Sequence, residues 1–223
     1  MYAQSLIVGN LPTLNPLDNF EQALATMTAF HVQHLPVVDE NGQYLGLLEE
    51  HALIDIEHLH EHHLLTELNF ANLRPFVIEN QPISELLKVF IDYRITAVPV
   101  LSQNADYLGC VTIEKVLDYF ANLTAAYEPG PIIVVEMHQR DYSLAYLARI
   151  IEECGAAVIS AYTTTNPDTM LLNVTLKVNA QDISAILAAF ERHDITINGA
   201  YTESNFNTDL QERYDSLLNY LNI

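Results

Sequence analysis

The chain has 223 residues and is 50% hydrophobic, which is enough to bury a sizeable core and argues against intrinsic disorder. It carries 29 Asp and Glu against nine Lys and Arg, so its formal net charge at pH 7 is −20. Because nucleic acids and anionic membrane surfaces are bound through clustered cations, this charge argues against both as partners. No apolar run reaches the roughly 18 residues of a membrane span. The first residues lack a signal-peptide pattern and the two cysteines are far apart, so we expect a cytoplasmic protein.

The first half of the sequence contains an internal repeat. The segment LPVV at 35–38 recurs as VPVL at 98–101, and YLG at 44–46 recurs as YLG at 107–109. Both pairs are separated by 63 residues, and further single residues match at the same separation. Several matches at one fixed offset, without a gap, indicate a duplicated unit.

Each copy of the repeat shows the same order of expected elements. A short extended piece precedes an amphipathic helix, which is expected to begin near Pro16 or Pro82. Two hydrophobic strands follow, joined by a polar turn, and the second is expected to end at Gly46 or Gly109. A second helix completes a β-α-β-β-α unit. One such unit cannot cover both faces of its sheet, so we expect the two copies to pack together.

This order, together with the Pro-Val and Tyr-Leu-Gly strands that occur twice, resembles the CBS domain, which is named for cystathionine β-synthase and occurs in tandem pairs. The resemblance covers about residues 1–125, which we divide into repeats at 1–62 and 63–127. It implies a compact module with clefts that often hold adenosine-containing ligands. It also implies regulation of an attached or partner protein by an AMP- or ATP-type ligand, with no other cofactor.

The pattern changes after the breaker cluster at 128–131, which predicts a linker. Residues 131–203 show the order β-α-β-β-α-β, which is that of the ferredoxin-like unit. The strands are expected at 132–137, 157–165, 170–178 and 195–201, and the helices at 143–153 and 182–193. This part resembles the ACT domain, a small regulatory module that often binds amino acids between paired copies. A CBS pair followed by an ACT-like domain is similar to relatives of the acetoin-utilization regulatory protein.

The remaining residues, 204–223, place Leu210, Tyr214, Leu217 and Leu221 at helical spacing. This spacing predicts an amphipathic helix that docks on its own chain or on a partner. The expected fold class is therefore α+β: a tandem CBS pair, a ferredoxin-like ACT-like domain and a C-terminal helix.

The candidate ligand site lies where the second strand of each repeat meets the following helix. In nucleotide-binding CBS domains this segment reads Gly-h-h-Thr/Ser-x-x-Asp, where h is hydrophobic, the hydroxyl meets phosphate and the carboxylate accepts from ribose. The second copy has Thr112 at the hydroxyl position and Lys115 at the carboxylate position. The first copy has Glu49 and Ala52 at these two positions.

Charge favours the second copy for an anionic ligand. Residues 1–73 contain no Lys or Arg, and a misplaced charge at about 4 Å costs on the order of 1–4 kcal/mol. The ligand would lie near Thr112 and Lys115, and an adenine ring would rest on the apolar floor formed by Thr96, Ala97 and Pro99. The alternative is that Thr112 only caps the following helix.

A cluster of potential metal ligands lies between the repeats. His58 and His62 are spaced i, i+4 within the segment 57–63, and two imidazoles at that spacing can bind one metal ion. A solvated connector explains the same residues, and no third ligand can be assigned, so we assign no metal site. In the ACT-like part, Asp141 keeps the first position of the Asp-x-x-Gly turn that is typical of amino-acid binding, but Leu144 replaces the glycine.

The sequence supports two main hypotheses for function. The first is a non-enzymatic sensor that acts as a homodimer and binds a small metabolite at the CBS pair or at the ACT-like domain. The second is an interaction module whose ligand sites have decayed, with metal binding at the histidine cluster as a weaker third. No nucleophile, acid-base pair or phosphate-loop motif is present, so we assign no catalytic residues.

Overall fold

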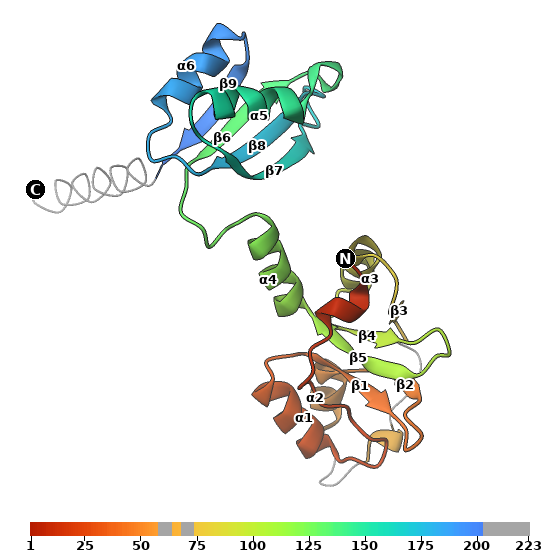
Figure 1. Ribbon diagram of the computed structural model, residues 1–223. Helices are drawn as coiled ribbons and strands as arrows, with labels where there is room; N and C mark the ends of the chain where they lie inside the picture. Colours follow the sequence, from red (N-terminus) through yellow and green to blue (C-terminus); the bar gives the residue numbers. More distant parts are fainter. Residues whose placement is uncertain (58–63, 68–73, 203–223) are drawn as a thin grey trace, which may run out of the picture. The chain divides into compact units, whose positions relative to one another are not determined.

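The computed structural model describes residues 1–57, 64–67 and 74–202 (Figure 1). Residue contacts divide the chain into two units, Met1–Tyr119 and Phe120–Ile223. The histidine cluster at 58–63 and the expected C-terminal helix lie outside the described residues. We describe each unit by itself.

The first unit contains two sets of elements that follow the offset of 63 residues. The first set is α1 (Phe20–Ala29), β1 (His34–Val38), β2 (Tyr44–Glu49) and α2 (Glu50–Glu57). The second set is β3 (Val77–Ile78), α3 (Ile83–Tyr93), β4 (Ala97–Leu101), β5 (Tyr107–Thr112) and α4 (Ile113–Leu123). Two 3-10 helices accompany them, η1 (Ala3–Leu6) and η2 (Leu65–Glu67). The bounds of β1 and β2, shifted by the offset, are those of β4 and β5, so the duplication seen in the sequence is also a duplication in structure.

The turns between paired strands are built in the same way with different residues. In the first repeat, one carboxylate oxygen of Asp39 accepts hydrogen bonds from the backbone N–H groups of Asn41 and Gln43, at 2.9 and 2.8 Å. In the second, the hydroxyl of Ser102 occupies the position of Asp39 and accepts two equivalent bonds at 3.1 Å. An oxygen acceptor at this position is thus sufficient to fix the turn.

The start of α1 differs from the sequence prediction. The helix begins at Phe20, four residues after Pro16. Asn19 is its N-cap, because the Asn19 side chain accepts a hydrogen bond from the Gln22 backbone while the Gln22 side chain accepts one from Asn19. This reciprocal pair satisfies two backbone donors that a proline start leaves unpaired, so it decides where the helix begins. Pro82 does cap α3, as its position suggested.

Two expected strand bounds are also wrong. Gly46 and Gly109 lie inside β2 and β5 rather than at their ends. Gly109 has a backbone φ of +148°, and a Cβ atom there would collide with the side chain of Ile7, so this glycine serves a close approach within the sheet. In the first repeat the expected extended piece is reduced to a single parallel bridge between Leu14 and Val37.

The second unit contains one four-stranded antiparallel sheet and two helices. Its elements are β6 (Ile132–Met137), α5 (Leu144–Glu153), β7 (Val158–Thr165), β8 (Leu172–Val178), α6 (Ser184–Arg192) and β9 (Thr196–Tyr201), with a short 3-10 helix η4 (Gln139–Asp141) before α5. The strands lie in the order β7-β8-β6-β9. Figure 1 shows α5 and α6 on the same face of this sheet.

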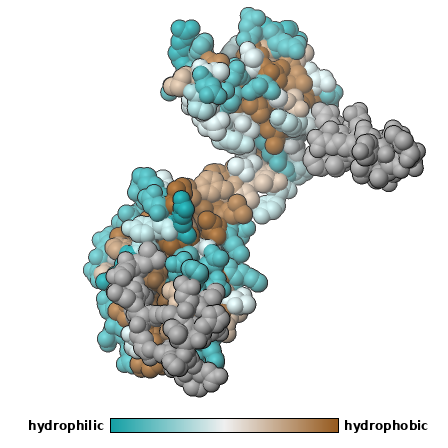
Figure 2. Space-filling model, turned by 180° about the vertical axis from the view of Figure 1, so that it is seen from behind, coloured by the Kyte–Doolittle hydropathy of each residue, from teal (hydrophilic) through white to brown (hydrophobic). Residues whose placement is uncertain are grey.

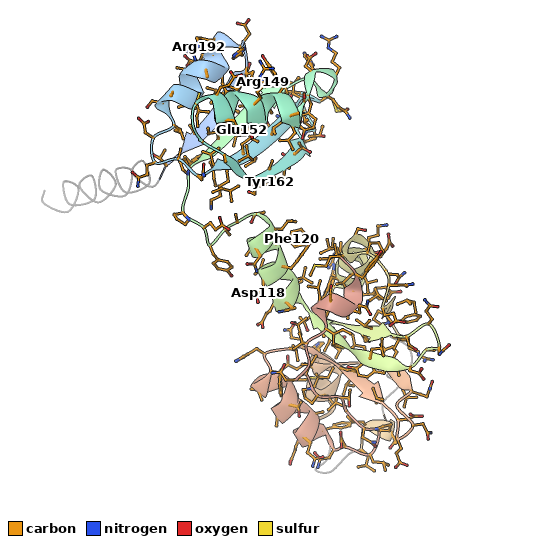
Figure 3. The ribbon with its side chains drawn as sticks, in the orientation of Figure 1. Asp118, Phe120, Arg149, Glu152, Tyr162 and Arg192 are labelled. Atoms are coloured by element: carbon orange, nitrogen blue, oxygen red, sulfur yellow. The ribbon has the colours of Figure 1, made fainter. Side chains whose placement is uncertain are left out.

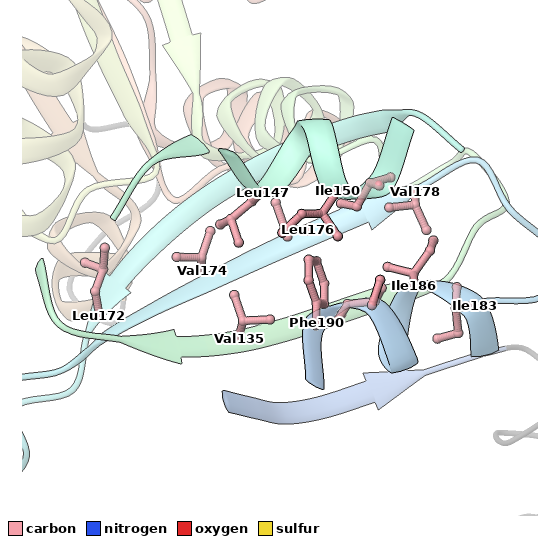
Figure 4. Packing of buried hydrophobic residues seen from close by; sticks show 13 residues of the cluster. Val135, Leu147, Ile150, Leu172, Val174, Leu176, Val178, Ile183, Ile186 and Phe190 are labelled. Carbon is pink, nitrogen blue, oxygen red and sulfur yellow. The ribbon is translucent and has the colours of Figure 1, made fainter. Parts of the chain in front are cut away.

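That face holds the core of the second unit (Figure 4). Alternate residues of β6 and β8 point toward the helices and are fully or almost fully buried, as period-two alternation requires. The cluster consists of Ile133, Val135, Leu147, Ile150, Ile151, Leu172, Val174, Leu176, Val178, Ile183, Ile186, Ala189 and Phe190. Leu144, the first residue of α5, lies outside this cluster and is 40% exposed.

The other face of the sheet contacts the end of α4. Lys177 on β8 is only 7% exposed, and its Nζ donates a hydrogen bond to the carbonyl of Ala125 at 2.6 Å. Ser160 on β7 donates to the carbonyl of Thr124 at 3.0 Å. These two carbonyls directly follow the C-terminus of α4, where a helix exposes unpaired acceptors and the negative end of its dipole. The sheet therefore fixes this helix end by two side-chain donors, one of them cationic.

Replacing Lys177 with Met should loosen the end of α4. The substitution keeps most of the side-chain volume but removes the charged donor, and a hydrogen bond from a charged group contributes roughly 1.5–3 kcal/mol. We expect the backbone amides of Thr124 and Ala126, which donate to Phe120 and Ala121, to exchange with solvent about tenfold faster or more. Hydrogen exchange followed by NMR measures this rate.

The control for that experiment is Lys88→Met. Lys88 is an exposed lysine of α3 whose Nζ pairs with Glu85 at 2.7 Å, so its loss removes the same charge at a different place. It should leave exchange at Thr124 and Ala126 unchanged. Equal exchange rates in Lys177→Met and in the unmodified protein would contradict the role assigned to Lys177.

Candidate ligand site

The candidate site begins at Thr96, which joins the two repeats. The Thr96 hydroxyl oxygen accepts a hydrogen bond from the backbone N–H of Gln33 at 3.0 Å. The Thr96 backbone N–H donates to Nδ1 of His34 at 3.3 Å, and the hydroxyl lies 3.2 Å from the same nitrogen. Since an N–H can only donate, Nδ1 is the acceptor and the imidazole is neutral in this arrangement. Gln33 and Thr96 are equivalent positions of the repeat, so this contact links the repeats near their shared axis.

Thr112 and Lys115 lie at the start of α4, beside Thr96. The Thr112 hydroxyl oxygen accepts from the backbone N–H of Lys115 at 3.3 Å, which is the geometry of a helix N-cap. The backbone N–H of Ile113 donates to the carbonyl of Thr96 at 3.0 Å. Thr112 is 8% exposed, whereas Lys115 is exposed. The structure thus brings three of the five candidate residues together at the positive end of a helix dipole.

The other two candidates are packed away from solvent. Ala97 is fully buried and pairs with Thr112 across the β4–β5 ladder. Pro99 is buried and pairs with Cys110. As the protein stands, neither side chain offers surface to an adenine ring. The groups open to a ligand at this place are the half-buried Thr96 and the exposed Lys115.

The equivalent place in the first repeat is a cavity with the opposite charge. It has a volume of about 290 Å³ and is lined by Gln33, Glu49, Glu50 and His51. Glu49 and Gln33 occupy the positions that Thr112 and Thr96 occupy in the second repeat. Two carboxylates at the mouth of this cavity oppose a phosphate, because like charges at short range repel. The two repeats therefore offer different chemistry at the same point of the fold.

His34 was not among the residues that the sequence singled out. It is 5% exposed on β1 and lies opposite Glu49 in the strand ladder. Burial lowers the pKa of the His34 imidazole below its ordinary 6.5, and the negative charge of Glu49 opposes part of that shift. The equivalent residue in the second repeat is Ala97, so the offset alone gave no sign of this contact.

The protein should lose stability as the pH falls below about 6.5 because His34 is held neutral in the folded state. The unfolded chain takes up a proton near the ordinary pKa and the folded chain takes it up only at lower pH, so stability is present above that pKa and is lost as the pH falls through the folded value. In His34→Asn the side-chain oxygen replaces Nδ1 as acceptor and does not titrate. Urea unfolding between pH 7.5 and 5 measures both proteins.

The other eight histidines are present in both proteins, so the difference between the two pH profiles isolates His34. We expect the free energy of unfolding to fall less steeply with acid in His34→Asn. Parallel profiles would show that Thr96 does not depend on a neutral imidazole.

The described residues hold little that could act in covalent or metal chemistry. Burial raises the pKa of the Cys110 thiol to about 12, which leaves it as an inert thiol at neutral pH. Across residues 1–57, 64–67 and 74–202, no three His, Cys, Asp or Glu side chains converge to hold a metal ion. Within the same residues, no helix combines the length and the apolar character needed to cross a membrane.

Comparison with known proteins assigns the first half of the chain. The family model of the CBS domain matches residues 4–58 and 74–122. Among curated proteins, the 5'-AMP-activated protein kinase subunit gamma-3 of Bos taurus is 26% identical over 127 residues, which span 51% of this chain and 26% of that relative. The chain thus covers only about a quarter of the length of this relative.

Solved structures are similar in fold. A Vibrio cholerae protein assigned to acetoin utilization superposes with a TM-score of 0.50 and 19% identity, covering 57% of this chain and 96% of that one. A CBS domain pair/ACT domain protein of Thermotoga maritima gives a TM-score of 0.44 and 18% identity over 55% of this chain and 98% of that one. With two matched segments that repeat the same elements at one offset, residues 4–58 and 74–122 are CBS domains, and the chain carries a tandem CBS pair.

Proposed function

We propose that this protein is a non-enzymatic regulatory sensor of the cytoplasm. In this proposal an adenosine-containing metabolite of the AMP or ATP type binds beside Thr96, Thr112 and Lys115 and changes the behaviour of the second unit or of a partner. The observation that carries the proposal is the start of α4, where the Thr112 cap, the helix dipole and the Lys115 ammonium favour one anionic group against the single carboxylate of Glu114 in the same turn. The bovine relative named above is, by its name, a subunit of a kinase that 5'-AMP activates.

The two CBS domains should differ in their use of that ligand. All Lys and Arg of the first unit follow residue 73, and Lys115 is the one at the site. The equivalent cavity of the first repeat has Glu49 and Glu50 at its mouth. We therefore expect one anionic ligand for each pair of repeats, at the second repeat, with Glu49 excluding phosphate from the first.

Helix α4 is the route by which ligand binding would reach the second unit. The helix begins at the proposed phosphate position, and the carbonyls that follow its end accept hydrogen bonds from Lys177 and Ser160. A helix held by side chains at both ends moves as one element, so a ligand that favours one position of its start also biases its end. The coupling can be no larger than the difference in ligand affinity between the two positions.

We also propose that residues 131–203 form an ACT-like domain. The support is the order β-α-β-β-α-β, the antiparallel sheet order β7-β8-β6-β9 and the two helices on one face. An amino acid at the Asp141 turn is a weaker part of this proposal. Leu144 is exposed at the position where glycine lets a ligand carboxylate approach the backbone, and Ser143 caps α5 by accepting from Tyr146 at 3.3 Å.

A homodimer fits an exposed apolar stripe on α4. Leu117 is 70% exposed, and Ile113, one turn earlier, is 47% exposed. Val116, which lies between them in the sequence, is buried. Figure 2 shows apolar surface gathered along this helix. A chain of net charge −20 repels its copies, so an uncharged stripe is where two copies can meet at least electrostatic cost.

The alternative function is an interaction module without a ligand. The burial of Ala97 and Pro99 favours it, because a nucleotide would have to open packed structure to reach them. In that case Thr112 only caps α4, and the CBS pair contributes a surface rather than a sensor.

Ligand binding can be tested by thermal unfolding with AMP, ADP, ATP and S-adenosylmethionine. A ligand at about 100 times its Kd should stabilise the protein by about 2.7 kcal/mol. The double variant Thr112→Ala with Lys115→Glu should abolish the stabilisation, because it removes the cap and reverses the charge at the phosphate position.

The control is Lys88→Glu, which makes the same charge reversal on α3 and should keep ligand-induced stabilisation. Stabilisation that survives in the double variant would move the site elsewhere. No stabilisation by any of the four ligands would favour the interaction module.

The dimer can be tested by replacing Leu117 with Glu. A buried carboxylate at a symmetric interface is costly, so we expect the dimer Kd to rise by tenfold or more and the molar mass in light scattering to fall toward 25.1 kDa at micromolar concentration. Leu17→Glu is the matched control, since Leu17 is 62% exposed in the first repeat. Equal masses for both variants would exclude α4 as the interface.

A further inference from the structure

The second unit contains a cavity that the proposed function does not use. It has a volume of about 330 Å³ and lies between the start of α5 and the turn that joins α6 to β9. That size is within the range of small-molecule sites, which run from roughly 300 to 1,000 Å³. Its lining comes from two segments far apart in the sequence, and its polar side chains are Glu136, His138, Asp141, Ser143, Tyr146, His193, Asp194 and Thr196.

One wall of the cavity is held by a contact between the two segments. The hydroxyl of Tyr146 on α5 lies 3.0 Å from Nδ1 of His193, which follows α6. The two rings meet edge to face, with centroids 5.8 Å apart and an interplanar angle of 84°. Two exposed side chains that fix each other in this way present a defined polar surface rather than a freely rotating one. The cavity is therefore shaped before any ligand arrives.

The charge of the lining favours a cation. Glu136 and Asp141 contribute carboxylates from one segment and Asp194 contributes one from the other, and no Lys or Arg belongs to the lining. Arg140 lies 3.6 Å from the Asp141 carboxylate, but both side chains are more than half exposed, so this pair is weak and open to exchange. A ligand ammonium group can replace the Arg140 guanidinium beside Asp141 at little cost.

The spacing of the ligating groups separates an organic cation from a metal ion. Among the described residues, no three His, Cys, Asp or Glu side chains converge closely enough for a metal, and this includes those of the cavity. Acidic groups spread around a volume of about 330 Å³ match a molecule with separated polar atoms instead. Tyr146 and His193 supply hydrogen-bonding atoms on its wall.

We propose that this cavity binds a small organic cation that carries a primary ammonium group, between Asp141 and Asp194 and against the Tyr146–His193 wall. The proposal goes beyond the nucleotide site at Thr112 and does not depend on it. It shares Asp141 with the amino-acid proposal, but it needs no approach of a ligand carboxylate to the backbone, where Leu144 replaces the glycine.

The test uses the full chain and three probes of equal length: 1,5-diaminopentane, pentane-1,5-diol and glutarate. Thermal unfolding and titration calorimetry are carried out near 150 mM salt, where unspecific attraction to the acidic chain is screened beyond about 8 Å. We expect the diamine to bind and to raise the Tm, and the diol and the dianion to do neither.

Two double variants locate the site. Asp141→Asn with Asp194→Asn should weaken diamine binding by tenfold or more, and Asn is tolerated at Asp194, whose backbone φ is +56°. Glu152→Gln with Glu191→Gln removes the same two charges from exposed positions outside the cavity, and Glu152 is labelled on α5 in Figure 3. This second pair should leave binding unchanged.

Equal weakening in both pairs would mean that the diamine responds only to overall charge, and it would overturn the proposal. Absence of diamine binding, or equal binding of the diol, would overturn it as well. Either result leaves stabilisation by nucleotides and its loss in the Thr112 and Lys115 double variant untouched, so the two proposals fail independently.

Discussion

The hydrogen bonds of Thr96 are the constraint on which the first unit depends. Its hydroxyl accepts from Gln33, its backbone N–H donates to His34, and its carbonyl accepts from the first residue of α4. One residue thus ties β1 of the first repeat to α4, the last helix of the second. Because buried polar groups are costly to leave unpaired, these contacts hold together or are lost together. A ligand that moves the start of α4 therefore acts on both repeats.

The two repeats have the same backbone structure but different side chains at equivalent positions. The paired strands coincide at the offset of 63 residues, and even the turns differ only in whether Asp39 or Ser102 supplies the acceptor oxygen. Glu49 and Thr112 stand at the same point of that backbone, and the Glu49 carboxylate would repel the anionic group that we propose beside Thr112. A fold that keeps its geometry while one position gains a negative charge separates the stability of the pair from the use of its sites. For this reason the CBS fold alone does not decide how many ligands the pair binds.

The strands whose positions follow from the internal repeat or from the apolar pattern could be predicted from the sequence. The offset located β1, β2, β4 and β5, and a short apolar run predicted β6 with its observed bounds. Contacts between residues that are distant in the sequence could not be predicted in this way, because they depend on how the chain packs. His34 has no counterpart in the second repeat, so its bond to Thr96 could not be read from the duplication, and the contact of Tyr146 with His193 joins segments 47 residues apart. Leu117 has the spacing of an apolar helix face and is 70% exposed, since spacing does not say whether that face meets the same chain.

Both ends of α4 are fixed by side chains, and this limits what a ligand can do there. The Thr112 hydroxyl caps the first turn and Lys177 binds a carbonyl just beyond the last. Each such contact contributes on the order of 1 kcal/mol or somewhat more. A phosphate at the start of the helix adds to a cap that is already made, so its effect on helix formation is small and its effect on helix position can be larger.

Burial of Lys177 makes loss of its partner costly, since an unpaired buried ammonium is far less stable than a paired one. The end of the helix is therefore held by a buried charged donor, and in the proposed sensor a ligand at Thr112 would act on the position of the start of α4 rather than on its folding.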